Sequence, residues 1–361
     1  MLRYKEIKIA LVEMVSTMKP GDKLPSRLEL CKKLETTRTT LDKAIMELCA
    51  DRVLSSEKGS ATRVVGFIEG TDKEADNWCV IVPDATEGIY NSLLRGIEEI
   101  AQQHGTNTII CSSHNDGDKQ EQYIKRLMVS GITGFAIVPI VADNPMESYR
   151  LYENLIRSKV PFVFCNRGVE GIDAPIVKSN DFYGGYIATK HLISMGYRKI
   201  AYICELKYST SIERYEGYIG ALMEEKLPVR PQYILIPPHG VMQDCMDAAK
   251  SLLQQADAPD AFFCFNDRIA FAVMRAVNAL NMQVSDDVGV IGYDDTFSCT
   301  ESSPQLTSIS YQSKEIGKTA ARVLVNARST GTEPYMPEYQ VFQPELAIRR
   351  SCRGPVRRDQ K

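Results

Sequence analysis

From residue 78 onward, short apolar segments alternate with longer amphipathic ones. The apolar segments read WCVIVP, TNTIICS, GFAIVPI, PFVFCN, KIAYIC, YILIP, AFFCFN and VGVIGYD. The segments between them have the apolar spacing of helices, at 90–103, 118–130, 146–158, 184–196, 212–226, 243–255 and 267–280. Regular alternation of strand and helix favours parallel sheets with right-handed crossovers. Because about 280 residues is long for one open sheet, we expect two α/β lobes with a cleft between them.

The first 68 residues follow a different pattern. Apolar residues recur at helical spacing in residues 4–18, and Ser26 and Glu29 have the spacing of a capping box at the start of a second helix. A third helix follows, and VLSSEKGSATRVV then reads as two extended segments around a Lys-Gly turn. This order predicts a winged helix-turn-helix. The polar segment EGTDKEADN, residues 69–77, is the expected linker to the α/β region.

The third predicted helix begins with the run TTRTTLDKAI at residues 36–45. Threonine is a poor residue inside a helix because its branched side chain loses rotamer freedom there. In the first turn, one hydroxyl can cap free N–H groups while the others point away beside a cation. Hydroxyl groups, the Arg38 guanidinium and the positive end of the helix dipole together suit contact with phosphate and base edges. The alternative is a surface salt bridge for Arg38 and plain capping by the threonines.

Charge and composition distinguish the N-terminal part of the chain from the α/β region. Residues 1–70 carry 13 Lys and Arg against 10 Asp and Glu, a net charge of +3, whereas residues 71–361 carry −6. The positive part is the one suited to a polyanion. The ten cysteines are scattered without a C-x-x-C pair, which favours reduced, buried thiols over disulfides or a metal site. The four histidines show no metal-ligand spacing, so we predict no metal and no cofactor.

Two further features bear on location and on rival functions. No segment approaches the ~20 apolar residues of a membrane span, and the N-terminus lacks the layout of a signal peptide. We therefore expect a cytoplasmic protein with no membrane partner, which argues against an exported transport protein. An enzyme is the other rival, with Asp294-Asp295 near Asn266-Asp267 as an acidic pair. However, no nucleophile elbow, phosphate loop, metal set or dinucleotide fingerprint accompanies them.

The N-terminal pattern resembles the DNA-binding domain of the GntR family. The segments GDKLPSRLELCKKLETTRTTLDKAIMEL and KGSATRV follow that family's L-P-S and S-R-x-T helices and its G-x-G-T-x-V wing. The resemblance implies DNA contact by the start of the recognition helix and by the wing, with Ser26 capping the second helix. The residues concerned are Ser26, Arg27, Thr37, Arg38, Thr39, Thr40, Lys43, Lys58, Gly59 and Ser60. Leu28 and Asp42 stand where the family usually has arginines, so the resemblance does not define the operator half-site.

The α/β region resembles the effector-binding core of the LacI/GalR repressors, which is itself similar to periplasmic sugar-binding proteins. Five blocks carry the resemblance in the family's order: NSLLRGIEEIAQQHG, SNDFYGGYIATKHLISMGYRKIAYIC, SIERYEGYIGAL, FFCFNDRIAFAVMRAVNALNMQVSDDVGVIGYDD and PQLTSISYQSKEIGKTAARVL. A GntR-type DNA reader joined to a LacI-type core is the arrangement of arabinose repressors of the AraR type. The implied fold is a winged helix-turn-helix domain plus a two-lobed, periplasmic-binding-protein-like α/β domain of type I with parallel sheets.

Matching these blocks residue by residue implies an effector site in the cleft. Its residues would be Asn166, Asn180, Asp181, Arg214, Asn266, Asp267 and Asp294. The loop PDATEGIY after the first strand could add Asp84, Glu87 and Tyr90, a solvated loop being the alternative. Arginine, carboxylates and amides satisfy the vicinal hydroxyls of a sugar, while an aromatic face covers its ring. Asn266 and Asp294 directly follow apolar strands, where α/β clefts bind their ligands, strand-end capping being the alternative.

These observations lead to a division of the chain and an expected function. We expect a DNA-binding domain at 1–68, a linker at 69–77, an effector-binding domain at 78–350 and a tail at 351–361, with lobe 1 at 78–178 and 307–330 and lobe 2 at 179–306 and 338–350. The resemblance implies a sugar-responsive repressor that binds a palindromic operator as a homodimer and is released by a monosaccharide, L-arabinose being the first candidate. Activation in place of repression, and another aldose or a deoxy sugar, are the alternatives.

Overall fold

The chain folds as two units, each with its own hydrophobic core. The computed structural model describes residues 3–16, 18–50, 53–56, 61–65, 76–142, 144–158, 160–204, 208–237, 241–329 and 339–353. The division falls between Met1–Ala75 and Asp76–Lys361. The core of the first unit is separate from the two hydrophobic clusters of the second.

The first unit is a small helical domain with a two-stranded hairpin. Its helices are α1 (Arg3–Ser16), α2 (Arg27–Lys33) and α3 (Arg38–Ala50), and its strands β1 (Leu54–Ser55) and β2 (Arg63–Val64) pair antiparallel. The predicted capping box is present, because the Ser26 hydroxyl accepts from the Glu29 N–H and the Glu29 carboxylate accepts from the Ser26 N–H. Apolar side chains of all three helices and of the hairpin form the core. The expected helix-turn-helix with its hairpin is therefore confirmed.

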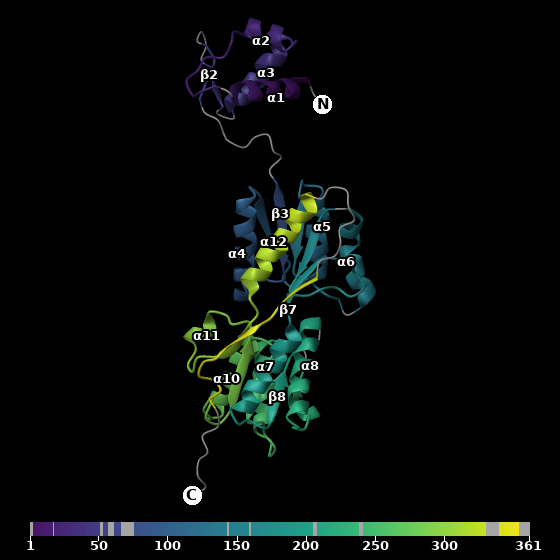
Figure 1. Cartoon of the computed structure of the whole chain (residues 1–361), viewed down its shortest axis with the longest axis vertical. Coiled ribbons are helices and arrows are strands. Elements are labelled where there is room, and N and C mark those ends of the chain that lie inside the picture. Colours follow the sequence, from purple (N-terminus) through teal and green to yellow (C-terminus); the bar gives the residue numbers. More distant parts are fainter. Residues whose placement is uncertain are drawn as a thin grey trace. The chain divides into compact units, whose positions relative to one another are not determined.

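The first sheet of the second unit has six parallel strands in the order β13-β7-β6-β5-β3-β4. They are β3 (Asn77–Val82), β4 (Asn107–Ser112), β5 (Gly134–Ile137), β6 (Phe162–Cys165), β7 (Ile176–Ser179) and β13 (Tyr339–Phe342). Helices α4 (Gly88–Gln103) and α12 (Ser313–Ser329) cover one face, and α5 (Gly117–Met128) and α6 (Pro145–Ser158) cover the other (Figure 1). Along β3, Val80 packs beneath α4 whereas Ile81 packs beneath α5 and α6, so this sheet is buried on both faces. This sheet and its helices are lobe 1.

The second sheet has the order β14-β12-β11-β10-β8-β9. Its strands are β8 (Ile200–Ile203), β9 (Ile234–Leu235), β10 (Ala261–Cys264), β11 (Gly289–Tyr293), β12 (Thr307–Ser310) and β14 (Glu345–Ala347), all parallel except β14. Its helices are α7 (Asp181–Ser194), α8 (Ser209–Glu224), α9 (Met242–Leu253), α10 (Asp267–Ala279) and α11 (Ser298–Glu301), with a 3-10 turn at Pro231–Tyr233. This sheet and its helices are lobe 2. The predicted two-lobed α/β architecture with parallel sheets is confirmed.

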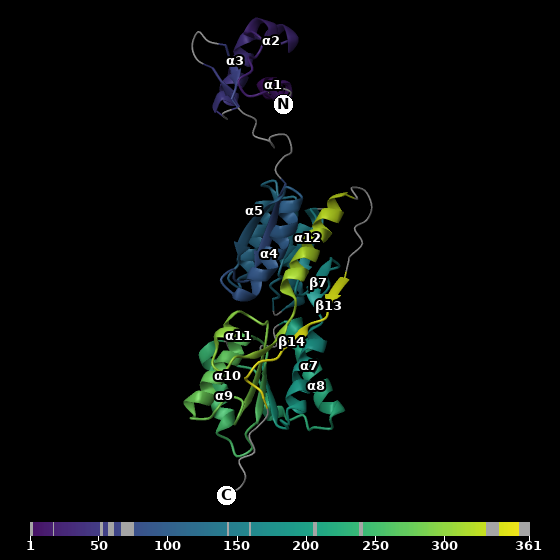
Figure 2. The same cartoon turned by 60° about the vertical axis from the view of Figure 1, so that its left-hand side comes forward.

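Three segments cross between the lobes, after β7, after β12 and after β13 (Figure 2). The sheets differ from the expected lobe limits at two strands. Residues 307–310 were expected in lobe 1, yet they form β12, which pairs with β11 in lobe 2. Residues 339–342 were expected in lobe 2, yet they form β13, which pairs with β7 in lobe 1. Each of these strands pairs within the sheet of the lobe in which the chain already lies, and the chain crosses to the other lobe only after the strand ends.

Glycine residues allow the helix pairs of each lobe to approach closely. In lobe 2, a Cβ on Gly185 of α7 would lie 2.2 Å from the carbonyl oxygen of Arg214, and a Cβ on Gly217 of α8 would lie 2.0 Å from that of Phe182. Gly96 of α4 and Gly317 of α12 meet the partner backbone in the same way in lobe 1. A side chain at these positions would force the helices apart. The contact between α7 and α8 therefore determines where the first turns of α8 lie.

The described ranges contain no membrane-spanning helix, no metal-binding cluster and no disulfide. No helix among these residues is long and apolar enough to cross a membrane. No group of three or more His, Cys, Asp or Glu side chains within the same residues is placed to hold a metal ion. The ten cysteines, all of them described, are free thiols, and eight of them are buried.

Candidate functional site

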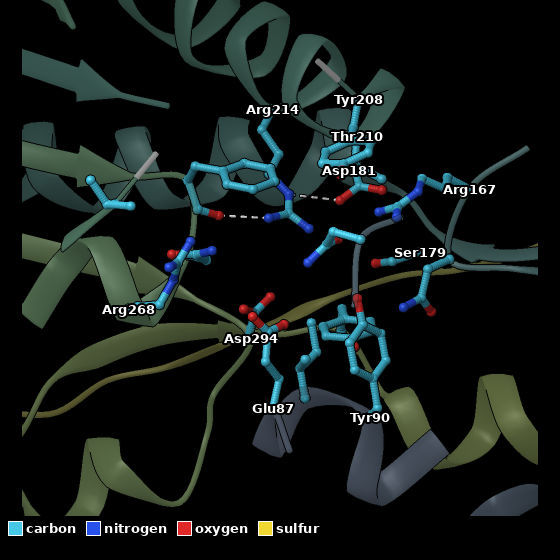
Figure 3. A pocket seen from close by; sticks show the side chains of 17 residues that line it. Glu87, Tyr90, Arg167, Ser179, Asp181, Tyr208, Thr210, Arg214, Arg268 and Asp294 are labelled. Carbon is cyan, nitrogen blue, oxygen red and sulfur yellow. Dashed lines mark hydrogen bonds and ion pairs between the residues drawn. The ribbon is translucent and has the colours of Figure 1, made fainter. Parts of the chain in front are cut away.

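A cavity of about 380 Å³ lies in the second unit, between the crossover segments and the ends of the strands (Figure 3). Its lining comes from both lobes and consists of Glu87, Ile89, Tyr90, Asn115, Asn166, Arg167, Ser179, Asp181, Tyr208, Thr210, Arg214, Val241, Phe265, Asn266, Arg268, Asp294 and Tyr311. Figure 3 shows Arg214 extending from α8 on one side of the cavity, with Glu87, which precedes α4, and Tyr90 of α4 on the opposite side. The cavity is thus built where parallel strands of two lobes end, as expected for a ligand site in an α/β fold.

Arg214 is the central cation of this cavity. Its Nε donates to Asp181 Oδ1 at 2.8 Å, and its Nη1 donates to the carbonyl oxygen of Phe265 at 2.6 Å. The guanidinium also lies 3.4 Å from the ring centroid of Tyr293. Because Arg214 is only 6% exposed, these contacts hold its plane in one orientation. Its Nη2 has no partner among the hydrogen bonds described, so that edge of the guanidinium can meet a ligand.

Two acceptors at strand ends have no partner among the described residues. They are Oδ1 of Asn166, the residue after β6 in lobe 1, and Oδ1 of Asp294, the residue after β11 in lobe 2. Both residues have left-handed backbone conformations, with φ of 67° for Asn166 and 112° for Asp294. Such conformations persist only where the surroundings impose them, and they concentrate at functional sites. An unsatisfied buried acceptor costs about 1–3 kcal/mol, which a ligand hydroxyl would recover.

Burial raises the pKa of the Asp294 carboxyl well above its usual range, and the nearby Arg214 opposes this only in part. The hydrogen bonds of Arg214 go to Asp181 and Phe265, and none of those described joins it to Asp294. The charged form of Asp294 is costly at this site, because burial penalises the carboxylate. A ligand that donates hydroxyl hydrogens to this group would remove part of that penalty.

Seven of the ten residues expected at the effector site line the cavity, namely Glu87, Tyr90, Asn166, Asp181, Arg214, Asn266 and Asp294. Asn266 also has the alternative role considered from the sequence, because its Oδ1 accepts from the Ile269 N–H and caps α10. Asp181 contacts the cavity but bonds to Arg214, so it orients that guanidinium. Most of the polar side chains expected at the effector site therefore lie around one cavity.

The other three expected residues do not line this cavity. Asp84 accepts hydrogen bonds from the N–H and the hydroxyl of Thr86, which forms a local turn. Asn180 caps α7 through the Tyr183 N–H and donates to Gln343 in another crossover segment. Both therefore have structural partners in place of a ligand.

Asp267 is the third of these residues. Its Oδ1 accepts from the Ser308 hydroxyl at 2.5 Å, and its Oδ2 accepts from the Thr296 N–H at 2.8 Å and from the Cys299 thiol at 3.1 Å. Burial raises the pKa of Asp267, and these hydrogen bonds counteract part of that rise. Asp267 thus fixes the loop that follows Asp294.

Several lining residues were missed by the sequence analysis. Arg167 directly follows Asn166, and its Nε donates to the Pro139 carbonyl oxygen at 2.7 Å. Thr210 lies one helical turn before Arg214, so helical spacing could have identified it. Tyr208 lies just before α8, and Tyr311 reaches the cavity only through the crossing after β12. No short-range signal marks Tyr311.

The N-terminus of α3 is the candidate DNA-contacting surface of the first unit. Thr37 Oγ1 accepts from the Thr40 N–H at 3.3 Å, so one threonine caps the helix as expected. The side chain of Arg38 is 79% exposed, and its nearest carboxylate, Asp42 on the same helix, is 3.8 Å away. Thr39 is exposed beside it. A cation and a hydroxyl therefore lie at the positive end of the helix dipole, in solvent.

Other residues expected at the DNA surface have partners within the domain. Ser26 belongs to the capping box of α2. Arg27 bonds to Asp42 at 2.6 Å and also to the hydroxyls of Thr62 and Ser56, so it ties α2 to α3 and the hairpin. The Lys43 ammonium lies 4.1 Å from the ring centroid of Tyr4. The wing residues Lys58, Gly59 and Ser60 lie outside the described residues.

Comparison with known protein families identifies both units. Residues 3–64 match the model of bacterial regulatory proteins of the gntR family. Residues 189–352 match the model of the periplasmic binding protein-like domain. The two matches fall on the helix-turn-helix domain and mainly on lobe 2, as the two resemblances in the sequence predicted.

Individual proteins are similar over larger parts of the chain. An arabinose metabolism transcriptional repressor of Geobacillus stearothermophilus is 24% identical over 356 residues, which cover 97% of this chain and 98% of that protein. The HTH-type transcriptional repressor PurR of Actinobacillus pleuropneumoniae is 29% identical over 280 residues, covering 76% of this chain and 80% of that protein. The structure of a LacI family transcriptional regulator from Enterococcus faecium with bound ribose has a TM-score of 0.67 and 27% identity, covering 78% of this chain and 100% of that one. The chain is therefore a transcriptional regulator that joins a GntR-family helix-turn-helix domain to a LacI-type, periplasmic-binding-protein-like domain.

Proposed function

We propose that this regulator is a repressor released from DNA by a neutral monosaccharide. The sugar binds in the cavity between the lobes and lowers the affinity of the helix-turn-helix domain for its operator. The observation that carries the proposal is the pair of acceptors without partners among the described residues, Asn166 Oδ1 and Asp294 Oδ1, one from each lobe. A polyhydroxylated ligand could satisfy both at once and would thereby connect the lobes.

The charge of the lining favours an uncharged sugar over a sugar phosphate. The lining contains three arginines and three carboxylates, and the Arg214 charge is already paired with Asp181. Tyrosine and phenylalanine rings supply the faces that cover a sugar ring. Relatives named for arabinose metabolism and a similar structure with bound ribose support a pentose. L-arabinose is the first candidate.

The mechanism is a shift between two arrangements of the lobes. The three crossing segments can act as a hinge, and a sugar that contacts both lobes binds more tightly to the closed arrangement. In a homodimer, that change alters the spacing of the two recognition helices on a palindromic operator. A coupling of ~1–3 kcal/mol between the two sites would release the operator about 5–150-fold.

The same mechanism requires a DNA partner and a location where DNA is present. Operator DNA is the macromolecular partner, and the exposed Arg38 and Thr39 at the start of α3 supply its contact surface. The protein acts in the cytoplasm, where that DNA is found. The mechanism requires no cofactor and no catalytic step.

L-Arabinose should raise the melting temperature of the purified full-length protein, because a ligand that binds only the folded state stabilises it. At 100 times the dissociation constant the stabilisation is about 2.7 kcal/mol. Thermal-shift measurements over a panel of monosaccharides and sugar phosphates test this expectation. Sorbitol at equal concentration controls for the general stabilising effect of polyols. A panel without a selective shift, or a shift with sugar phosphates alone, would contradict the proposed effector class.

Asp294→Asn should stabilise the empty protein at neutral pH while weakening sugar binding. A raised folded-state pKa means that stability is lost as the pH rises from the ordinary range of an aspartate, about 4, through the raised value. An asparagine is neutral throughout, so the melting temperature of the variant should exceed that of the wild type at pH 8, and the difference should shrink towards pH 4. Replacing one acceptor oxygen by an amide NH₂ group should weaken sugar binding about tenfold or more. Equal melting temperatures across this range would show that burial does not raise the pKa of Asp294.

Arg38→Ala should weaken operator binding about tenfold without changing the affinity for sugar, because the two sites lie in different units. The operator can be obtained by selecting random DNA on the protein itself, and binding can be followed by fluorescence anisotropy over a range of salt concentrations. If Arg38 contacts a phosphate, the variant should release about one counterion fewer, so the slope of log affinity against log salt concentration becomes shallower by about one. Lys8→Ala is the control, since Lys8 pairs with Glu47 within the domain. Equal weakening by both variants would mean that Arg38 makes no specific DNA contact.

A further inference from the structure

A buried lysine connects the two lobes beside the cavity. Lys178 belongs to β7, the last strand of lobe 1 before the first crossing, and its side chain is 7% exposed. Its Nζ lies 2.5 Å from Glu213 Oε1, and Glu213 is on α8 of lobe 2. The ion pair therefore joins the sheet of one lobe to a helix of the other.

Burial makes the partner of Lys178 essential. Burial alone acts to lower the pKa of this lysine, but its hydrogen bond and attraction to Glu213 outweigh burial and raise the pKa, so the ammonium stays charged. A buried charge left without its partner strongly destabilises a protein. The ammonium thus strongly favours conformations in which Glu213, and with it the start of α8, stays next to β7.

Glu213 directly precedes Arg214, so two ion pairs link the same two segments. Lys178 in β7 and Asp181 at the start of α7 lie on either side of the first crossing, while Glu213 and Arg214 lie on α8. Along the chain, the cation Lys178 comes before the carboxylate Asp181, whereas on α8 the carboxylate Glu213 comes before the cation Arg214. Each carboxylate therefore faces its own cation, and sliding of α8 along the crossing segment would separate both pairs.

A second contact from lobe 1 reaches the start of the same helix. The Arg167 guanidinium lies 4.0 Å from the ring centroid of Tyr208, the residue that precedes α8. Arg167 is itself fixed to lobe 1 by its bond to the Pro139 carbonyl oxygen. Lobe 1 therefore holds the first turns of α8 at two points, one inside the cavity and one beside it.

We propose that Lys178 and Glu213 are a positioning pair, which holds the first turns of α8 against lobe 1 and thereby sets Arg214 in its effector-binding place. The pair touches no ligand, because neither residue lines the cavity. It acts on sugar affinity through the population of the arrangement in which Arg214 is correctly placed. This role rests on the proposed function, in which Arg214 binds the effector.

The test replaces both charges, so that no buried charge is left unpaired. Lys178→Met with Glu213→Leu removes the ion pair while keeping side chains of similar size, a replacement that is often neutral for stability. Lys190→Met is the matched control, because Lys190 pairs with Glu224 and Glu225 inside lobe 2 and joins no lobes. Lys178→Arg preserves the charge and should preserve the function. Glu213→Gln is the second variant if the double replacement does not fold.

Two measurements on the full-length protein give independent answers. Hydrogen exchange of residues 208–218 without any sugar should become about tenfold faster in the double variant, and the calorimetric dissociation constant of L-arabinose should weaken about tenfold, with the melting temperature close to the wild type. Lys190→Met and Lys178→Arg should match the wild type in both. Wild-type exchange and affinity in the double variant would overturn the proposal, as would a lower melting temperature with unchanged affinity, which marks a purely structural pair. If the wild type does not bind L-arabinose, the proposed effector fails, whereas the exchange measurement still decides the role of the pair.

Discussion

The buried ion pair between Arg214 and Asp181 is the interaction on which the cavity depends. It requires α7 and α8 to lie close together, which Gly185 allows because its missing side chain leaves room for the Arg214 backbone. It also requires that no water competes for the guanidinium, since both side chains are almost fully buried. With its charge paired and its plane fixed against Tyr293, Arg214 can present its remaining N–H groups to a ligand without the cost of an isolated buried cation.

Around this pair, the fold uses strand ends to hold groups that would be unfavourable elsewhere. Asn166 and Asp294 occupy left-handed backbone conformations, and each has a carbonyl or carboxylate oxygen without a partner among the described residues. Asp267 and its bonds to Ser308 and Thr296 hold the loop after Asp294 in this conformation. The cavity thus combines backbone strain with unsatisfied polar groups, and in the proposed mechanism a bound sugar satisfies these groups as the lobes close.

Features that depend on residues close together in the sequence could be predicted from the sequence. The capping box of α2, the threonine cap of α3 and the strand–helix alternation are of this kind, and so are the polar residues directly after strands. The sequence could not decide which of two adjacent polar residues turns inward. Asp181 and Asn266 line the cavity, whereas their neighbours Asn180 and Asp267 bond to the protein. Tyr311 and the lobe membership of β12 and β13 depend on where the chain crosses between sheets, which no local pattern records.

In the proposed mechanism, sugar in the second unit and DNA on the first unit oppose each other. Thermodynamic linkage requires the effect to be reciprocal, so the operator must weaken sugar binding by the same factor by which the sugar weakens operator binding. The most direct measurement is the dissociation constant of L-arabinose by calorimetry, with and without a saturating amount of selected operator. Sugar binding should be about 5–150-fold weaker in the presence of operator. Identical dissociation constants would contradict it, because the two units would then bind their ligands independently.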